Sequence, residues 1–155
     1  MSTNSHLALT EQVLSRTYIR YARAMARERV STGTPFEQVA GFSRAIRVGR
    51  TVHVAGTTAT DQEGRVLAKG NAAEQTKIVI QRIDRALKEV GASLSDIVQT
   101  RMYVINENDC YRVMKSHGEA FKEIRPVSTL VVVRSLVDPE MLVEIEALAV
   151  ISRNS

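Results

Sequence analysis

Two hydrophobic periodicities follow one another along the chain from residue 44 onward. Apolar residues at alternate positions on both sides of a Gly49-Arg50 turn predict a β-hairpin over residues 44–54, which runs on into Ala55-Gly56-Thr57-Thr58. From Asn71 the spacing becomes helical, since Asn71 is a favourable N-cap and Gly91 suits the position just after a helix. The apolar face of this expected helix consists of Val79, Ile83, Ala86, Leu87 and Val90.

The second half of the chain repeats the change from strand to helix. Alternation over Ile97–Ile105 predicts a strand, and a helix is expected from about Cys110 to Ile124, where Arg125-Pro126 ends it. Residues 127–133 are almost all apolar and β-branched, which predicts a strand buried on both faces. A last strand is expected over Leu142–Ile151.

This order, β-β-α-β-α-β-β, predicts an α+β sandwich in which two helices cover one face of a mixed sheet. The other face would still display Val, Leu and Tyr side chains, more than a soluble monomer normally exposes. We therefore expect the chain to form an oligomer through its uncovered sheet face.

The length and composition fit one compact domain, because the chain has 155 residues, 44% of them hydrophobic and 25% charged. We place this domain at residues 25–155 and treat residues 1–24 as an N-terminal extension, helical or disordered. The extension carries arginines and few acidic residues, so it is either an amphipathic appended segment ahead of Met25 or a mitochondrial transit peptide. The expected location is the cytoplasm, with mitochondria as the alternative.

Charge and residue counts exclude several classes of function. Residues 1–29 hold five arginines against two glutamates, which leaves the remainder almost neutral although the whole chain carries +4. Nucleic acid is therefore not an expected partner. No stretch reaches the roughly 18 apolar residues of a membrane helix. One cysteine excludes a disulfide framework, and three widely separated histidines show no metal-ligand spacing, so neither metal nor cofactor is expected.

The most informative polar residues lie in the last predicted strand. Alternation places Glu144 and Glu146 on one face with Leu142 and Leu148. Two carboxylates there are costly unless they are paired, hydrogen-bonded or used. They are either charges that protect an exposed face from aggregation or, for Glu144, a general acid/base that positions water.

The other chemically interesting residues favour structural roles. His117 and Cys110 lie on the apolar stripe of the second helix, which indicates core packing. Ser128-Thr129 lacks the surroundings of a nucleophile elbow, and Met114 is interpreted as a packing residue.

Several motifs, taken in order, resemble the Rid (YjgF-like) family. They are Gly41-Phe42-Ser43-Arg44-Ala45-Ile46, Val54-Ala55-Gly56, Glu74-Gln75-Thr76, residues 91–98, Arg125-Pro126 and residues 143–150. The resemblance covers about residues 36–151. It implies a chorismate-mutase-like homotrimer with clefts between subunits, which hydrolyses enamine or imine products of amino-acid dehydratases to 2-keto acids and ammonia without cofactor or metal.

The resemblance also implies roles for individual residues. Phe42 matches an aromatic wall of the cleft, Ala55-Gly56 its backbone, and Glu144 the glutamate that supports a water. The family places an arginine that binds the substrate carboxylate two residues after the proline, and this chain has Ser128 there. Met114 likewise stands where the family usually has a polar residue. The expected substrate-binding residues are Phe42, Ala55, Gly56, Met114, Ser128, Thr129 and Leu130, with Glu144 as the catalytic residue.

Three functions follow as hypotheses. The first is hydrolytic deamination of a small imine or enamine, either similar to 2-iminopropanoate or 2-iminobutanoate or uncharged, with Ser128 and Thr129 holding its polar end. Arg101, Arg125 and Arg134 are candidates to replace the absent arginine. The second is a non-catalytic trimer that binds a small regulatory molecule in the same clefts. Endoribonuclease activity is the least favoured, because the expected domain is nearly neutral and has no cluster of His and Lys.

Overall fold

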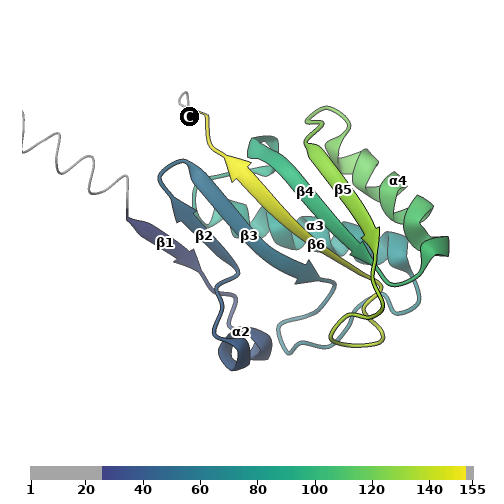
Figure 1. The fold of residues 1–155 in the computed structure, drawn as a ribbon. Helices are drawn as coiled ribbons and strands as arrows, with labels where there is room; N and C mark the ends of the chain where they lie inside the picture. Colours follow the sequence, from purple (N-terminus) through teal and green to yellow (C-terminus); the bar gives the residue numbers. More distant parts are fainter. Residues whose placement is uncertain (1–25, 153–155) are drawn as a thin grey trace, which may run out of the picture.

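The computed structural model describes residues 26–152, which form a single six-stranded sheet and its helices (Figure 1). The strands are β1 (Arg27–Val30), β2 (Ala45–Val48), β3 (Thr51–Thr58), β4 (Ile97–Val104), β5 (Val127–Val132) and β6 (Val143–Val150). The helices are α2 (Pro35–Ala40), α3 (Ala72–Lys88) and α4 (Cys110–Phe121), with short 3-10 turns η1 (Leu94–Asp96) and η2 (Glu107–Asp109). This arrangement confirms the predicted α+β fold.

The strands are ordered β1-β2-β3-β6-β4-β5 across the sheet. All neighbours are antiparallel except β4 and β5, which run parallel because α4 connects them. Figure 1 shows α3 and α4 side by side behind one face of the sheet. The sheet is therefore mixed and covered by two long helices on one side, as the sequence pattern predicts.

The hydrophobic core lies between the sheet and these two helices. Alternate strand residues such as Val52 and Ile145 are fully buried against Ile83 and Leu87 of α3. The predicted N-cap of α3 is confirmed, since the side chain of Asn71 accepts a hydrogen bond from the backbone N–H of Glu74 at 3.1 Å. The cap fixes where α3 begins, and the helix packs on β3 and β6.

Two elements precede the predicted pattern and were not expected. β1 consists of Arg27-Glu28-Arg29-Val30 and lies at the edge of the sheet, where only Val30 is buried. Its sequence therefore shows no alternation of apolar and polar residues. α2 has six residues, too few to show a helical period in the sequence. Proline occupies its first position, and Gly41, with φ +66°, follows its last residue. Both elements border the site described below.

Two predicted elements differ in detail from the structure. α4 ends at Phe121 rather than Ile124, because the N–H groups of both Ile124 and Arg125 donate to the Phe121 carbonyl and close the last turn. The expectation that residues 127–133 are buried on both faces is wrong for this chain. β5 is an edge strand paired only with β4, and Val127, Val131 and Val132 are exposed.

The face opposite α3 and α4 carries the alternating residues that the pattern assigns to it. It bears Glu144, Glu146 and Leu148 of β6 and His53 of β3, together with an ion pair of 2.8 Å between Arg101 and Glu146. Phe42, Ile46 and Leu148 help to line a shallow concavity of about 730 Å³ on this face.

Candidate functional site

Three of the residues singled out in the sequence line one pocket. Phe42, Gly56 and Glu144 border a cavity of about 290 Å³ beside α2, which we call the Glu144 pocket. Its other walls come from α2, from the end of β3 and from the loop before β6: Thr34, Phe36, Val39, Ala40, Arg44, Thr58, Thr60, Val137 and Met141. The pocket therefore brings one carboxylate into a mostly apolar hollow.

A β-bulge in β3 shapes this pocket. Val54 pairs with Ala147 and Thr57 with Ile145, so two residues of β3, Ala55 and Gly56, lie opposite one residue of β6. Such a bulge bends the strand and redirects the residues beside it. Ala55 accordingly lines the concavity of the uncovered face, whereas Gly56 lines the Glu144 pocket.

Gly56 leaves room for the Glu144 carboxyl, and its backbone conformation is an ordinary one. A Cβ atom built on Gly56 would overlap Oε1 of Glu144 and would lie 2.9 Å from its Cδ. The carboxylate therefore lies directly against the backbone of the bulge, in space that only glycine leaves free.

The surroundings of Glu144 favour its protonated form. Burial raises the pKa of this carboxyl above its ordinary value of 4.5, the charge of Glu146 raises it further, and the charge of Arg44 lowers it. A carboxyl with a raised pKa is suited to exchange a proton with a bound molecule.

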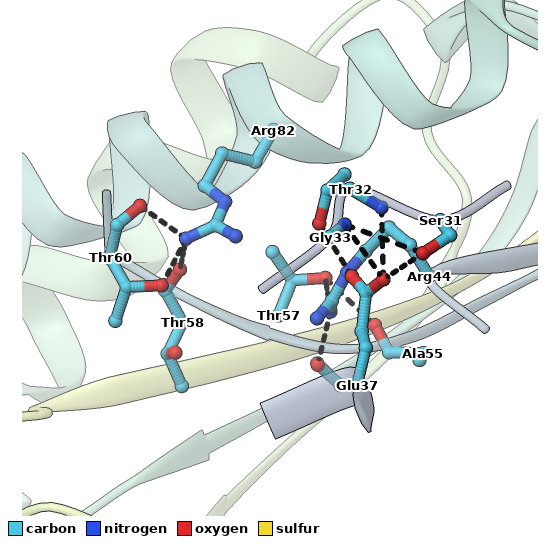
Figure 2. Close-up of polar contacts among 11 residues, drawn as sticks. Ser31, Thr32, Gly33, Glu37, Arg44, Ala55, Thr57, Thr58, Thr60 and Arg82 are labelled. Carbon is cyan, nitrogen blue, oxygen red and sulfur yellow. Dashed lines mark hydrogen bonds and ion pairs between the residues drawn. The ribbon is translucent and has the colours of Figure 1, made fainter. Parts of the chain in front are cut away.

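Arg44 holds the bulge in place (Figure 2). Its Nη1 donates to the Gly56 carbonyl at 2.8 Å and to Thr57 Oγ1 at 3.1 Å, while its own carbonyl accepts from Ala55 N–H at 3.0 Å. The ring of Phe42 lies over the guanidinium, 5.2 Å from Cζ to the ring centroid. Arg44 is only 5% exposed, so this cation lies inside the wall of the pocket.

Glu37 of α2 is the buried anion behind Arg44. Its carboxylate accepts hydrogen bonds from Ser31 Oγ at 2.6 Å, from Thr32 N–H at 2.9 Å and from Thr32 Oγ1 at 2.5 Å, and it lies 3.4 Å from Arg44 Nε. Burial alone would raise the pKa of Glu37, but the hydrogen bonds from Ser31 and Thr32 and the charge of Arg44 lower it to about 2. Glu37 is therefore ionised at neutral pH and fixes the loop before α2.

Arg82 of α3 completes the support of β3. Its Nη1 donates to the carbonyl of Thr58 at 3.1 Å and contacts the carbonyl and hydroxyl oxygens of Thr60 (Figure 2). The register of β2 with β3 ends at Ala45 and Val54. Beyond it, the side chains of Arg44 and Arg82 supply the donors that a neighbouring strand would otherwise provide.

The remaining predicted binding residues lie elsewhere in the chain. Met114 is half exposed on α4, and Ser128, Thr129 and Leu130 belong to the edge strand β5. Ser128 Oγ accepts a hydrogen bond of 3.0 Å from Thr100 Oγ1, which is also 3.0 Å from His117 Nε2. These residues do not line the Glu144 pocket of the same chain.

His117 and Cys110 lie where the sequence pattern places them. His117 is 8% exposed, packs against Phe121 with the ring centroids 4.5 Å apart, and has its pKa lowered by burial. Cys110 is partly buried against the core. Residues 26–152 contain no group of three or more His, Cys, Asp or Glu side chains placed to hold a metal ion. Within the same residues, no helix is long and apolar enough to span a membrane.

Sequence reasoning missed the basic residue of the pocket. The candidates to replace the absent arginine were Arg101, Arg125 and Arg134, but none of them lines the Glu144 pocket, and Arg101 is paired with Glu146. Arg44 lines it instead. The available signal was its position immediately before a strand, in the motif Gly41-Phe42-Ser43-Arg44 beside the aromatic residue already singled out.

Comparison with known proteins agrees with the fold and the site motifs. The profile of the Ribonuc_L-PSP family, described as Endoribonuclease L-PSP, matches residues 32–151. A crystal structure of a YjgF family member from Mycobacterium tuberculosis superposes with a TM-score of 0.73 and 42% identity, covering 81% of this chain and all of that one.

Several relatives are named as deaminases. The chain is 32% identical to the 3-aminoacrylate deaminase RutC of Acinetobacter baylyi, over 76% of this chain and 91% of the relative. It is 26% identical to the human 2-iminobutanoate/2-iminopropanoate deaminase, over 82% of this chain and 92% of the relative. The family match spans the whole sheet except β1, together with its helices, and includes Phe42, Gly56 and Glu144. The chain therefore belongs to the Ribonuc_L-PSP family, the group of YjgF-like or Rid proteins that includes relatives named as deaminases.

Proposed function

We propose that this protein hydrolyses the C=N bond of small imine or enamine metabolites to a carbonyl compound and ammonia, with Glu144 as the catalytic residue. The observation that carries the proposal is the half-buried Glu144 carboxyl, which lies against the bulge at Gly56 and has a raised pKa. The names of the two deaminase relatives support the same reaction class.

The reaction needs only one group that exchanges protons. The imine reacts in its protonated form, C=NH2+. Glu144, ionised, takes a proton from a water molecule as the water oxygen attacks the carbon, and the electron pair of the C=N bond moves to nitrogen to give a carbinolamine. Glu144 then returns the proton to that nitrogen, and the C–N bond breaks as the carbonyl forms. The leaving ammonia takes the hydroxyl proton and departs as ammonium. A pKa raised by burial makes the ionised carboxyl a better proton acceptor.

The proposed assembly is a homotrimer with the reaction in clefts between subunits. Within one chain, the pocket side of the site (Phe42, Gly56 and Glu144) is separate from the strand side (Met114, Ser128 and Leu130). The strand side lies on an exposed apolar edge, as an interface strand would. Light scattering on the purified full chain tests this assembly, and a monomer would contradict it.

The activity is tested by ammonia release from imines that an amino-acid oxidase generates in situ. We expect the native protein to exceed the uncatalysed rate and Glu144→Gln to lose roughly 100-fold or more of that activity, the contribution of a positioned acid/base group. Because burial and the charge of Glu146 disfavour the charged carboxyl more than the charge of Arg44 favours it, we expect the neutral glutamine not to destabilise the fold.

Glu140→Gln is the matched control, since Glu140 is exposed, precedes β6 and, among residues 26–152, forms an ion pair only with Lys69 at the surface. It should leave the rate unchanged. If Glu144→Gln changes only the affinity for a ligand and the native protein releases no ammonia, the non-catalytic binding trimer is the better interpretation.

The word endoribonuclease in the family description does not change this proposal. Among the described residues, those that line the Glu144 pocket include neither His nor Lys. A general acid/base pair for RNA cleavage would have to come from elsewhere.

A further inference from the structure

A second cavity, of about 480 Å³, lies between α3 and the segments that follow β1 and β3. Glu144 does not line this cavity, so it is separate from the proposed reaction. Three arginines do line it, Arg44, Arg82 and Arg85, and we call it the arginine cavity. Arg82 and Arg85 are three residues apart on α3 and therefore lie on the same side of the helix.

The guanidinium of Arg82 is held in place by the end of β3 and leaves one edge without partners. Its Nη1 donates to the Thr58 carbonyl at 3.1 Å and contacts both oxygens of Thr60 (Figure 2). Its Nε and Nη2 donate to none of residues 26–152 and are not fully buried, so solvent reaches both atoms. Their N–H groups point in parallel from one edge of the planar guanidinium. This is the fork with which arginine binds two oxygens of an anion.

The carboxylates in the wall of the cavity do not neutralise these arginines. Within residues 26–152, neither Arg82 nor Arg85 forms an ion pair. Asp61 lines the cavity, but one of its oxygens lies 2.7 Å from Nε of Arg65 and its charge is compensated there. Glu89 also lines the cavity and is exposed to solvent. The cavity therefore keeps an excess of positive charge.

This excess of charge acts on Arg82 itself. Burial lowers the pKa of Arg82, and the charges of Arg44 and Arg85 lower it further. The charges of Glu37 and Asp61 act in the opposite direction but do not compensate for this. The arginines are thus close enough to repel one another. A bound anion would offset the repulsion and form charge-assisted hydrogen bonds with Arg82 and Arg85.

The size and the apolar side of the cavity indicate what kind of anion fits. A volume of about 480 Å³ is in the range of small-molecule sites and leaves room beside a single inorganic ion. Leu67 and Ile78 line it without being fully buried, so they offer apolar surface to an organic group. A phosphate group has three free oxygens and up to two negative charges, so it can bind the fork of Arg82 and the guanidinium of Arg85 together.

We propose that the arginine cavity binds a small phosphate monoester. Its phosphate group is held by the Nε–Nη2 edge of Arg82 and by the guanidinium of Arg85, and its organic part lies against Leu67 and Ile78. Arg44, which is almost completely buried, contributes positive charge from the wall. The site is distinct from the Glu144 pocket and does not depend on the proposed deaminase reaction.

The experiment is a calorimetric titration of the full chain with phenyl phosphate and, separately, with benzoate, which has the same ring but a planar carboxylate of single charge. We expect phenyl phosphate to bind at least about 10-fold more tightly, as for one additional charge-assisted hydrogen bond. Arg85→Gln should weaken phenyl phosphate binding roughly 10-fold. Because Arg85 is exposed, its replacement should leave thermal unfolding unchanged.

Two further variants separate the site from general effects of charge and folding. Arg112→Gln makes the same change at an exposed arginine of α4 outside the cavity, and it should bind phenyl phosphate as the native chain does. Glu89→Gln removes a carboxylate from the wall and should tighten binding roughly 2-fold to 5-fold. Damage to the fold would not produce such a gain.

Several results would overturn the phosphate site. They are the absence of phenyl phosphate binding at millimolar concentration, equal affinity for phenyl phosphate and benzoate, and unchanged binding by Arg85→Gln. An equal loss in Arg85→Gln and Arg112→Gln would also overturn it, because the effect would then be one of net charge alone. Since no turnover is measured, the outcome is independent of whether imines are hydrolysed.

Discussion

The two regions that carry the predicted site residues are built in opposite ways. Around the Glu144 pocket, the polar groups of Glu37, Arg44 and Thr57 are buried and joined by several short hydrogen bonds. Along β5, the side chains are exposed or only half-buried, and Ser128 has a single hydrogen bond to Thr100. The polar groups around the Glu144 pocket find their partners within the chain, whereas the side chains of β5 remain exposed on its surface. This contrast is consistent with the proposed site between two copies, which needs a preformed wall and a free surface on each copy.

The largest expected difference between the regions is in stability. Glu37→Ala leaves the buried guanidinium of Arg44 without its anion, so we expect a loss of about 3–5 kcal/mol in the free energy of unfolding. Ser128→Ala removes one hydrogen bond at an exposed strand and should cost about 1 kcal/mol or less. Urea denaturation at one fixed protein concentration measures both. Equal losses would show that Glu37 contributes no more to the free energy of unfolding than Ser128 does.

Acid should weaken the pocket region selectively. The pKa of Glu37 is lowered from 4.5 to about 2 in the folded chain, because the hydrogen bonds and Arg44 outweigh the effect of burial. A carboxyl with a lowered folded pKa stabilises the protein above its unfolded pKa. That stabilisation, about 3 kcal/mol, is lost as the pH falls from about 4.5 toward 2.

The measurement is the difference in stability between native protein and Glu37→Gln from pH 6 to pH 2. This difference should shrink steadily below pH 4.5. A difference that is the same at pH 3 and pH 6 would contradict the assigned role of the carboxylate.

A smaller loss than that at Glu37 is expected at the bulge itself. In Gly56→Ala the new methyl group overlaps Glu144, and overpacking of this kind costs about 1–3 kcal/mol. Gly118→Ala, on α4 in open space, should instead stabilise the chain by about 0.5–1 kcal/mol, because alanine suits a helix interior better. Combining Gly56→Ala with Glu144→Ala should recover most of the loss in a double-mutant cycle. Additive losses would mean that Glu144 is not what excludes a side chain there.

Most of the fold could be predicted from the sequence, because long segments with one period leave few alternatives. α3 has a clear N-cap and an apolar stripe, and β6 has strict alternation, so both occur where expected. β1 and α2 were missed because their length or charge gives no period. The burial of β5 was misjudged, since apolar and β-branched composition does not distinguish a central strand from an exposed edge strand.

The candidate site could be predicted only where a residue breaks a pattern. Glu144 was identifiable as a carboxylate in an apolar strand, and the site on β3 was indicated by Gly56. Arg44 was not identifiable, since its role depends on a bulge and on a short helix that no local pattern predicts. Its contacts with Glu37, Gly56 and Thr57 form only after folding, and they are a property of three-dimensional packing.

The bulge of β3 also has a consequence for how chain length can vary in evolution. Val54 and Thr57 face the core although three positions separate them, because one residue of the pair Ala55-Gly56 is extra to the ladder. Deleting that residue would restore regular alternation and leave the strands on either side in register. We expect such a deletion to keep the pairing of the strands but to close the space that receives the Glu144 carboxyl. At this point, a change of chain length should alter the proposed site more than the sheet.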